Sequence, residues 1–227
     1  MGGVAYYENE LDYYRGIRMV EAEDTMGAYA DLGLPSGTLW ATCNIGATSP
    51  EDYGDYFAWG ETEPYDENGK TTFNESTYKW CNGSSSTLTK YNTSSSDGTV
   101  DNKTELDLED DAAYVNWGSS WRMPSKAQFD ELINSSYTTT EWTSVNGVNG
   151  RLITSKTNGN SIFLPAAGYR DGTSLNLAGS SGYYWSRSLD TSYPYYARRL
   201  GFGSSIIFTS SGDRYLGRSV RPVRLSE

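Results

Sequence analysis

Apolar and polar positions alternate in several short segments of the chain, which is typical of strands that bury one face. In residues 31–43 a Pro35-Ser36-Gly37 turn separates two such segments, so we predict a hairpin there. Residues 151–156 and 160–164 flank Asn158-Gly159, a dipeptide that favours tight turns. We therefore predict a second hairpin around that turn.

The last alternating segment, residues 219–224, is also expected to be a strand. We expect it to pair with the strand near 38–43, which would bring the two ends of the domain together. Asn146-Gly147 and Asn149-Gly150 are further turn dipeptides, so the chain from residue 134 onward is expected to be mostly β.

Three segments carry helix signals. Ser49-Pro50-Glu51-Asp52 has a capping Ser, Pro at the first helical position and acids after it, which predicts a short helix that ends by Gly60. Residues 107–118 begin with acids and end at a glycine, as helices often do. The clearest signal is a capping box at 124–128, followed by a helical apolar stripe in residues 129–133.

Residues 1–28 are polar, acidic and rich in tyrosine, and we interpret them as an arm or attachment segment that could mediate assembly. Residues 29–227 are then expected to form a single domain, as the chain length suggests. Within it, 61–105 consists largely of turn-forming residues. A loop of that length is usually functional or mobile.

The charge is distributed unevenly along the 227 residues. Residues 1–164 hold 10 basic and 25 acidic residues, whereas 165–227 hold eight arginines, no lysine and four acids. The net charge of −11 argues against general nucleic-acid binding, which needs a basic face. No apolar run is long enough for a membrane span, and no secretory signal is visible.

The absence of histidine excludes Ser-His-Asp and Cys-His catalysis and histidine metal ligands. Cys43 and Cys81 could form one disulfide or remain two free thiols, and both alternatives stay open. A nucleophilic role for either is disfavoured, because no histidine can activate the thiol.

Two groups of acids could form a catalytic or a metal site. Residues 107–111 supply carboxylates suited to calcium but lack the EF-hand spacing, so a solvated helix start is the simpler interpretation. Asp55, Glu61 and Glu63 could form a glycosidase pair, although acids often lie near each other by chance. We therefore predict no enzyme activity, no metal and no cofactor.

Several motifs together resemble the family called the Fibrobacter succinogenes major paralogous domain, over roughly residues 30–224. They are Asp31-Leu32-Gly33-Leu34, Leu39-Trp40-Ala41-Thr42-Cys43-Asn44-Ile45-Gly46-Ala47, Gly54-Asp55-Tyr56-Phe57-Ala58-Trp59-Gly60-Glu61-Thr62, Trp121-Arg122-Met123-Pro124-Ser125-Lys126, Phe163-Leu164-Pro165-Ala166-Ala167-Gly168-Tyr169-Arg170 and Ser219-Val220-Arg221-Pro222-Val223. The resemblance implies an α+β fold of C-type lectin type, with a twisted antiparallel sheet, two or three short helices and paired terminal strands. The calcium-dependent sugar motifs of true C-type lectins are missing, since Glu63-Pro64-Tyr65 is only a fragment of one.

The resemblance also implies that the stretch between residues 168 and 218 varies. In members linked to diversity-generating retroelements this stretch is diversified by adenine-directed mutagenesis, and here it departs from the usual Asn, Tyr and Ser filling. The predicted ligand-binding residues are Asp171, Leu177, Ser181, Arg187, Arg198, Arg199, Gly201, Gly203, Ile206, Phe208, Ser210, Asp213, Leu216 and Arg218.

Arginine and aromatic residues dominate binding hot spots, which favours contact with a ligand over a bland surface. We expect Arg187, Arg198 and Arg199 to be exposed. For residues 206–208, burial in a core strand and contact with a ligand are equally weighted, because strand alternation puts one face inside. Trp117 and residues 121–124 are expected to be core, with Arg122 held by carboxylates or carbonyls.

These observations predict a non-enzymatic protein that binds a protein or surface ligand through side chains displayed on a rigid scaffold. Its location would be the cell surface or the exterior, as an adhesin, or a phage virion, as a tail receptor-binding protein. The alternative is a structural or surface module of the same family that is not diversified.

Overall fold

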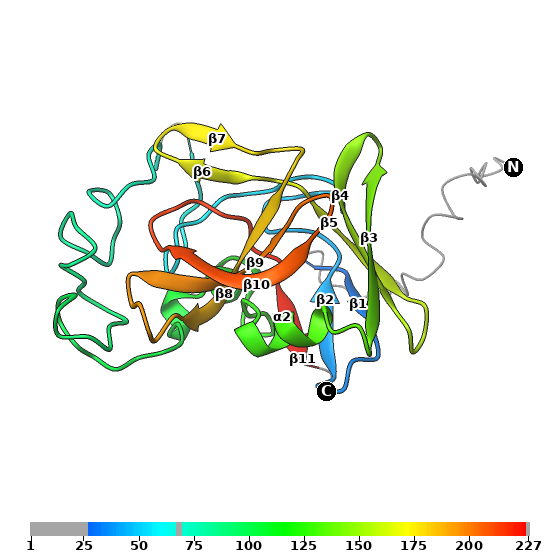
Figure 1. The fold of residues 1–227 in the computed structure, drawn as a ribbon, viewed down its shortest axis with the longest axis horizontal. Helices are drawn as coiled ribbons and strands as arrows, with labels where there is room; N and C mark the ends of the chain where they lie inside the picture. Colours follow the sequence, from blue (N-terminus) through cyan, green and yellow to red (C-terminus); the bar gives the residue numbers. More distant parts are fainter. Residues whose placement is uncertain (1–26, 67–69, 226–227) are drawn as a thin grey trace, which may run out of the picture.

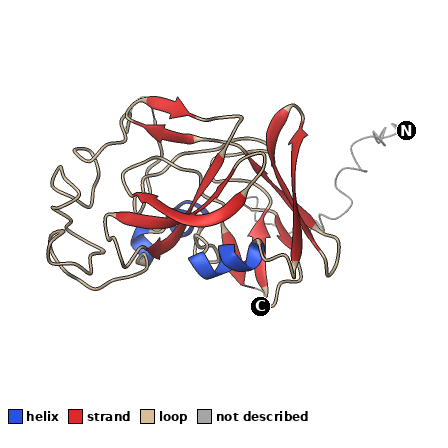
Figure 2. Ribbon diagram, in the orientation of Figure 1, coloured by secondary structure: helices blue, strands red, loops and turns tan. Residues whose placement is uncertain are grey.

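The computed structural model describes residues 27–66 and 70–225, and strands make up most of the ordered elements in that part of the chain (Figures 1 and 2). The strands are β1 (Tyr29–Asp31), β2 (Thr38–Ala41), β3 (Thr138–Val145), β4 (Val148–Ser155), β5 (Ser161–Pro165), β6 (Tyr169–Asp171), β7 (Ser174–Asn176), β8 (Gly182–Leu189), β9 (Tyr196–Phe202), β10 (Ile207–Asp213) and β11 (Val223–Leu225). The helical elements are the 3-10 turn η1 (Leu108–Asp110), α1 (Ala112–Trp117) and α2 (Lys126–Leu132).

The predicted α+β fold of C-type lectin type is wrong for this chain. The described residues form a mostly β structure of four small sheets, with two α-helices of only six and seven residues. The strand orders are β1-β2-β11, β10-β9-β8, β3-β4-β5 and β6-β7. Short helices and several separate sheets replace the single twisted sheet with packed helices that the resemblance implied.

The contact expected between the two ends of the domain is present. β2 pairs antiparallel with β11, with Trp40 opposite Val223, and β1 pairs with the other edge of β2. Trp40 and Val223 are 0% and 2% exposed, so this sheet is part of the main core.

Two of the three Asn-Gly dipeptides lie at turns, as predicted, and the third lies inside a strand. Asn146 and Gly147 have φ angles of 47° and 81° and join β3 to β4, and Gly159 lies in the turn before β5. Asn149-Gly150 is not a turn, because Gly150 lies inside β4. A Cβ there would come 2.3 Å from the carbonyl oxygen of Leu164, so glycine permits close packing of two strands instead.

The predicted helix after Ser49 is wrong. The carboxylate of Asp52 accepts hydrogen bonds from the backbone N–H groups of Thr48 and Ser49, which closes a turn rather than starting a helix. Gly54 then has a φ of +67° with the carbonyl of Ile45 packed against it. A left-handed residue in such close contact ends any helical path immediately.

The helix predicted after the capping box is confirmed as α2, whereas the one predicted over 107–118 is divided at Asp111 into the 3-10 turn η1 and the short helix α1. Asp111 caps α1 by accepting from the N–H groups of Ala113 and Tyr114, and Gly118 follows its last residue. α2 begins with the predicted capping box, in which Ser125 and Gln128 bond each other's backbone N–H groups. Arg122 donates to the carbonyls of Ser119 and Trp121, so carbonyls rather than carboxylates hold it.

In the part of the chain that the structure describes, no helix is long and apolar enough to cross a bilayer. The predicted arm, residues 1–28, lies outside the described residues except for its last two. The loop region within 70–105 is tied together by isolated bridges such as Cys81–Leu88, and both of these residues are buried.

Candidate ligand-binding face

The sheet β8–β9–β10 has two chemically different faces. On one face, Leu200 and Phe202 are 0% and 2% exposed and belong to the main core. Helix α2 packs on the same side, where Thr209 donates a hydrogen bond to Asp130 at 2.7 Å. β10 and α2 are adjacent in Figure 1. This face fixes the backbone of the sheet on the rest of the protein.

Strand register assigns the residues of the opposite face. Cross-strand partners share a face, and the side-chain period of a strand is two. Tyr183, Gly201 and Phe208 form one row across the sheet, and Trp185, Arg199 and Ser210 form the next. We call these six residues, together with Gly212 and with Arg218 that packs on it, the arginine face.

Arg199 lies at the centre of this face. Its guanidinium stacks 4.6 Å from the ring centre of Tyr183, whose ring makes an edge contact with Tyr169. Its Nε donates to the backbone oxygen of Ser211 at 3.2 Å, whereas its Nη1 is buried without a hydrogen-bond partner. Burial lowers the pKa of Arg199, and the nearby Tyr183 and Tyr169 oppose that shift.

Arg218 is the more unusual arginine, because it is 4% exposed and its Nε and Nη1 atoms have no hydrogen-bond partner. Its guanidinium lies 4.1 Å from the ring centre of Trp185, and no carboxylate of the described residues lies within ion-pair distance. Burial lowers the pKa of Arg218 well below its usual value, and the positive charge of Arg199 lowers it further.

Two glycines make room for these guanidinium groups. A Cβ on Gly201 would come 2.5 Å from Nη1 of Arg199 and 3.4 Å from the ring of Phe208. A Cβ on Gly212 would come 2.5 Å from Nη2 of Arg218. Neither glycine has a positive φ, so the reason for glycine at these positions is space and not backbone conformation.

An acidic edge borders Arg218. Burial raises the pKa of Asp213, the charge of Arg218 lowers it, and the charges of Glu75 and Asp171 raise it. Asp213 is therefore close enough to influence Arg218 electrostatically, but the two do not form an ion pair.

The remaining predicted residues lie in three other places. Arg187 bonds Glu105 at 2.9 Å and Arg198 bonds Asp190 at 3.0 Å, so both are structural ion pairs as well as partly exposed. Leu177 and Ile206 are 50% and 56% exposed at turns. Gly203 lies near Ser181, and its carbonyl accepts from Arg151. Asp171 is exposed at the end of β6.

Three of the predicted contact residues are buried. Leu216 is 8% exposed, Arg218 is 4% exposed, and Gly201 lies beneath Arg199 and Phe208. The question left open for residues 206–208 is answered by alternation: Ile207 packs against the core, whereas Phe208 is half-buried on the arginine face.

Sequence reasoning missed Tyr169, Tyr183, Trp185 and Gly212 as members of this region. Tyr183 and Trp185 alternate with the core residue Tyr184, and this period of two was the available signal. The position of Gly212 beneath Arg218 had no sequence signal, because it depends on a contact between separate elements.

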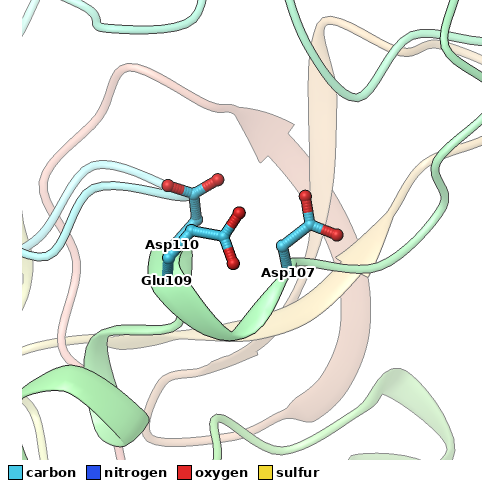
Figure 3. A group of neighbouring side chains, drawn as sticks. All are labelled: Asp107, Glu109 and Asp110. Carbon is cyan, nitrogen blue, oxygen red and sulfur yellow. The ribbon is translucent and has the colours of Figure 1, made fainter.

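The acids of η1 form an ion-pair network rather than an open cation site. The carboxylates of Asp107, Glu109 and Asp110 lie near one another (Figure 3). The ammonium group of Lys90 lies 2.7 Å from Asp107 and 2.6 Å from Asp110, and Lys79 also contacts Asp110. These lysines already balance the charge that a metal ion would have neutralised.

Other candidate groups are engaged in internal contacts. Glu61 lies beside a groove of about 410 Å³ but pairs with Lys70 and accepts from the N–H of Lys79. A second groove, of about 530 Å³, is lined partly by Arg122 and Arg187, whose donors bond neighbouring groups. Cys43 and Cys81 are free thiols.

The chain was compared with known protein families, curated proteins and solved structures. Residues 142–223 match a family described as a domain of unknown function (DUF8237). The matched segment begins within β3 and ends at the first residue of β11, so it contains the whole arginine face. Neither a curated protein nor a solved structure matches the chain.

Proposed function

We propose that this protein is a non-enzymatic ligand-binding protein that recognises a protein or cell-surface ligand through the arginine face. One observation carries the proposal: Arg199 and Phe208 are partly exposed side chains on a sheet whose other face is packed against α2 and the core. A backbone fixed in this way loses little entropy when its side chains bind a ligand.

The residue types on the face suit recognition. Arg, Tyr and Trp are enriched among residues that dominate binding energy, and an arginine stacked on an aromatic ring is already oriented. Exposed turn residues such as Leu177 and Ile206 lie within the same chain segment and would extend the contact area.

The test is a glycan array and a surface-proteome pull-down with the full chain and two variants. We expect Phe208→Ala to lower the affinity for any captured ligand at least tenfold. Truncating a hot-spot side chain costs about 2 kcal/mol or more of binding free energy. The control for stability effects is Ile133→Ala. Ile133 is partly buried and packs against the main core, on the other side of the sheet from the arginine face.

Equal binding by the wild type and Phe208→Ala, with unchanged melting temperatures, would contradict the assignment of this face. Loss of binding only in proportion to lost stability, as in the control variant, would contradict it as well.

We further propose that residues 168–218 are a diversified segment of a variable protein, presented on a cell surface or on a phage virion. The neighbouring DNA tests this directly. A reverse-transcriptase gene with a near-copy of codons 168–224 that differs only at adenines is expected, and its absence favours a module that does not vary. A position among tail genes would identify the phage setting.

A further inference from the structure

We propose that the arginine face binds an anionic group of its ligand, a carboxylate or a sulfate, between Arg199 and Arg218. This inference rests on the proposed function and names the chemistry of the ligand. Its starting point is Arg218, a buried guanidinium with two nitrogen atoms that have no partner.

The protein itself shows how it satisfies a buried arginine elsewhere. Arg214 is 1% exposed and donates to Tyr78 Oη and to the carbonyls of Tyr91, Pro194 and Lys90, at 2.9–3.0 Å. Arg221 is 0% exposed, and its four hydrogen bonds go to Asn44 and to three backbone carbonyls.

Arg218 departs from this rule. Among the described residues no side-chain hydrogen bond is formed by its guanidinium, although it is nearly as buried as the other two. A buried donor without a partner costs about 1–3 kcal/mol, and more for a charged group. A ligand that accepts hydrogen bonds from Arg218 would offset this cost, whereas the fold alone does not.

The unpartnered groups around Arg218 are all able to donate. Nη1 of Arg199 and the hydroxyl of Ser210, which are cross-strand neighbours, are also buried without partners. Together with Nε and Nη1 of Arg218 they offer N–H and O–H groups to one region of the sheet. Three of these four groups are guanidinium N–H donors that cannot accept, and such a cluster is complementary to an anion, whose oxygens accept hydrogen bonds.

The charges in the region lead to the same ligand class. The two guanidiniums repel each other, as the effect of Arg199 on the pKa of Arg218 indicates. The ring of Tyr183 packs against both guanidinium groups, with its centre 4.6 Å from that of Arg199 and 5.8 Å from that of Arg218. This contact holds the two cations in place without neutralising them. An anion between them would remove the repulsion.

Asp213 is the internal competitor for this role. Its negative charge raises the pKa of Arg218 and so favours the charged guanidinium, but the two side chains do not form an ion pair. Burial raises the pKa of Asp213, and the charges of Glu75 and Asp171 raise it further, so the charge of Asp213 is itself disfavoured. The acidic edge therefore leaves the guanidinium of Arg218 free for an external acceptor.

Arg199 and Phe208 are half-buried and both lie over Gly201, which has no side chain to hold them there. Outward rotation of the Arg199 side chain would expose its own unpartnered Nη1 while the backbone of the sheet stays unchanged.

The first test uses the full wild-type chain and needs no variant. Thermal unfolding is followed during titration with acetate, with its neutral isostere acetamide, with sulfate and with inorganic phosphate, at constant ionic strength. At a tenfold excess over Kd we expect the bound anion to raise Tm by roughly 3–6 °C, saturably, whereas acetamide does not. The acetate and sulfate arms distinguish carboxylate ligands from sulfated ones.

The second test compares two arginine variants of the same burial. In anion-free buffer, Arg218→Met should have a Tm equal to or above that of the wild type, because it removes a buried unpaired charge. Its saturable anion shift should be lost, and any general stabilisation by sulfate should remain. Arg214→Met is the matched control and should lower Tm by roughly 10 °C or more, because its carbonyl partners lose their donor.

Two results would overturn the inference. One is an Arg218→Met variant that fails to fold or loses as much stability as Arg214→Met, which would make Arg218 structural. The other is a wild-type protein that shows no saturable anion effect, or one that persists unchanged in Arg218→Met.

Failure of this inference is distinguishable from failure of the proposed function. A captured ligand whose binding depends on Phe208 but is not reduced by acetate or sulfate would retain the proposed function and overturn the anion site. Saturable anion binding in the absence of any captured ligand that depends on Phe208 would retain the anion site and overturn the proposed function.

Discussion

At the scale of single residues, Lys90 illustrates how one side chain balances several charges. Burial would lower its pKa, but hydrogen bonds to Asp107 and Asp110 outweigh that effect and raise it. Asp110 has a side-chain exposure of only 2%, and Lys90 is the nearer of the two lysines that pair with it. We expect Lys90→Met to lower the free energy of unfolding by about 3 kcal/mol, because the buried carboxylate of Asp110 loses a positively charged partner.

Urea unfolding would measure the effect, with Lys103→Met as the matched control. Lys103 also contacts Asp107, but its side chain is 45% exposed, so its loss should cost less than about 1 kcal/mol. Similar losses in both variants would show that the network does not depend on burial.

Asp213 is expected to make stability depend on pH in a defined direction. Because burial raises its pKa above the ordinary 3.8, the folded state binds the proton more tightly than the unfolded state. Its contribution is therefore complete below pH 3.8 and is lost as pH rises through the raised folded value. The stability of the wild type relative to Asp213→Asn should decline over that range in urea titrations.

Asp107 provides the opposite case. Hydrogen bonds from Lys103 and Lys90 lower its pKa, so its contribution is present above 3.8 and is lost as pH falls through the lowered value. Wild type relative to Asp107→Asn should therefore lose stability toward acid. The same slope for both aspartates would contradict this account.

At the scale of elements, the sequence was informative wherever the determinants were local. The capping box of α2 and the hairpin turns at Asn146-Gly147 and Asn158-Gly159 could be predicted, because each depends on residues that are neighbours in the chain. The helix expected after Ser49 failed because Asp52 bonds the backbone in a turn, an alternative that the same residues also allow.

The capping box of α2 provides a stability prediction. Ser125→Ala removes the acceptor for the Gln128 N–H and should lower the free energy of unfolding by about 1 kcal/mol. Ser136→Ala, at an exposed turn position, is the control and should change it by less than about 0.5 kcal/mol. Chemical denaturation of both variants would measure the difference, and equal effects would contradict a capping role.

The two glycines of the arginine face allow a prediction about geometry. Gly212→Ala places a methyl group where the guanidinium of Arg218 lies, and the far end of that side chain can move aside. We expect a stability change of less than about 2 kcal/mol but a clear shift of the Arg218 side-chain resonance in ¹H–¹⁵N spectra. Gly83→Ala, with open space around it but a φ of +84°, controls for general effects of replacing glycine. An unshifted resonance in Gly212→Ala would contradict the packing described here.

At the scale of the whole molecule, the β2–β11 pair closes the described part of the chain. Val223 is 2% exposed, pairs with Trp40 on one side and bridges to Arg122 on the other. Val223→Asp should abolish cooperative unfolding, because a buried unpaired carboxylate costs several kcal/mol, of order the whole stability. Ile206→Asp, at a 56% exposed position, should unfold nearly as the wild type does in a thermal melt.

The candidate site could be predicted only in part for the same reason that the fold could. Residue types indicated a binding segment in 168–218, but which arginines lack partners depends on contacts made far away in sequence. Within the described residues, Glu105 pairs with Arg187, whereas Nε and Nη1 of Arg218 have no hydrogen-bond partner. The fold class was wrong because motif similarity does not determine how short strands divide into sheets.

Arg198 and Arg199 are consecutive in β9 and point to opposite sides of the sheet, one to Asp190 and the other to Tyr183. Inserting or deleting a single residue in β9 would exchange these positions and bring Leu200 out of the core. Such length changes should therefore be eliminated in related chains, whereas substitutions at Arg199 or Phe208, which keep the strand register, should be tolerated by the fold. Changes in length would be confined to the exposed turn at residues 204–206, where no side chain changes face.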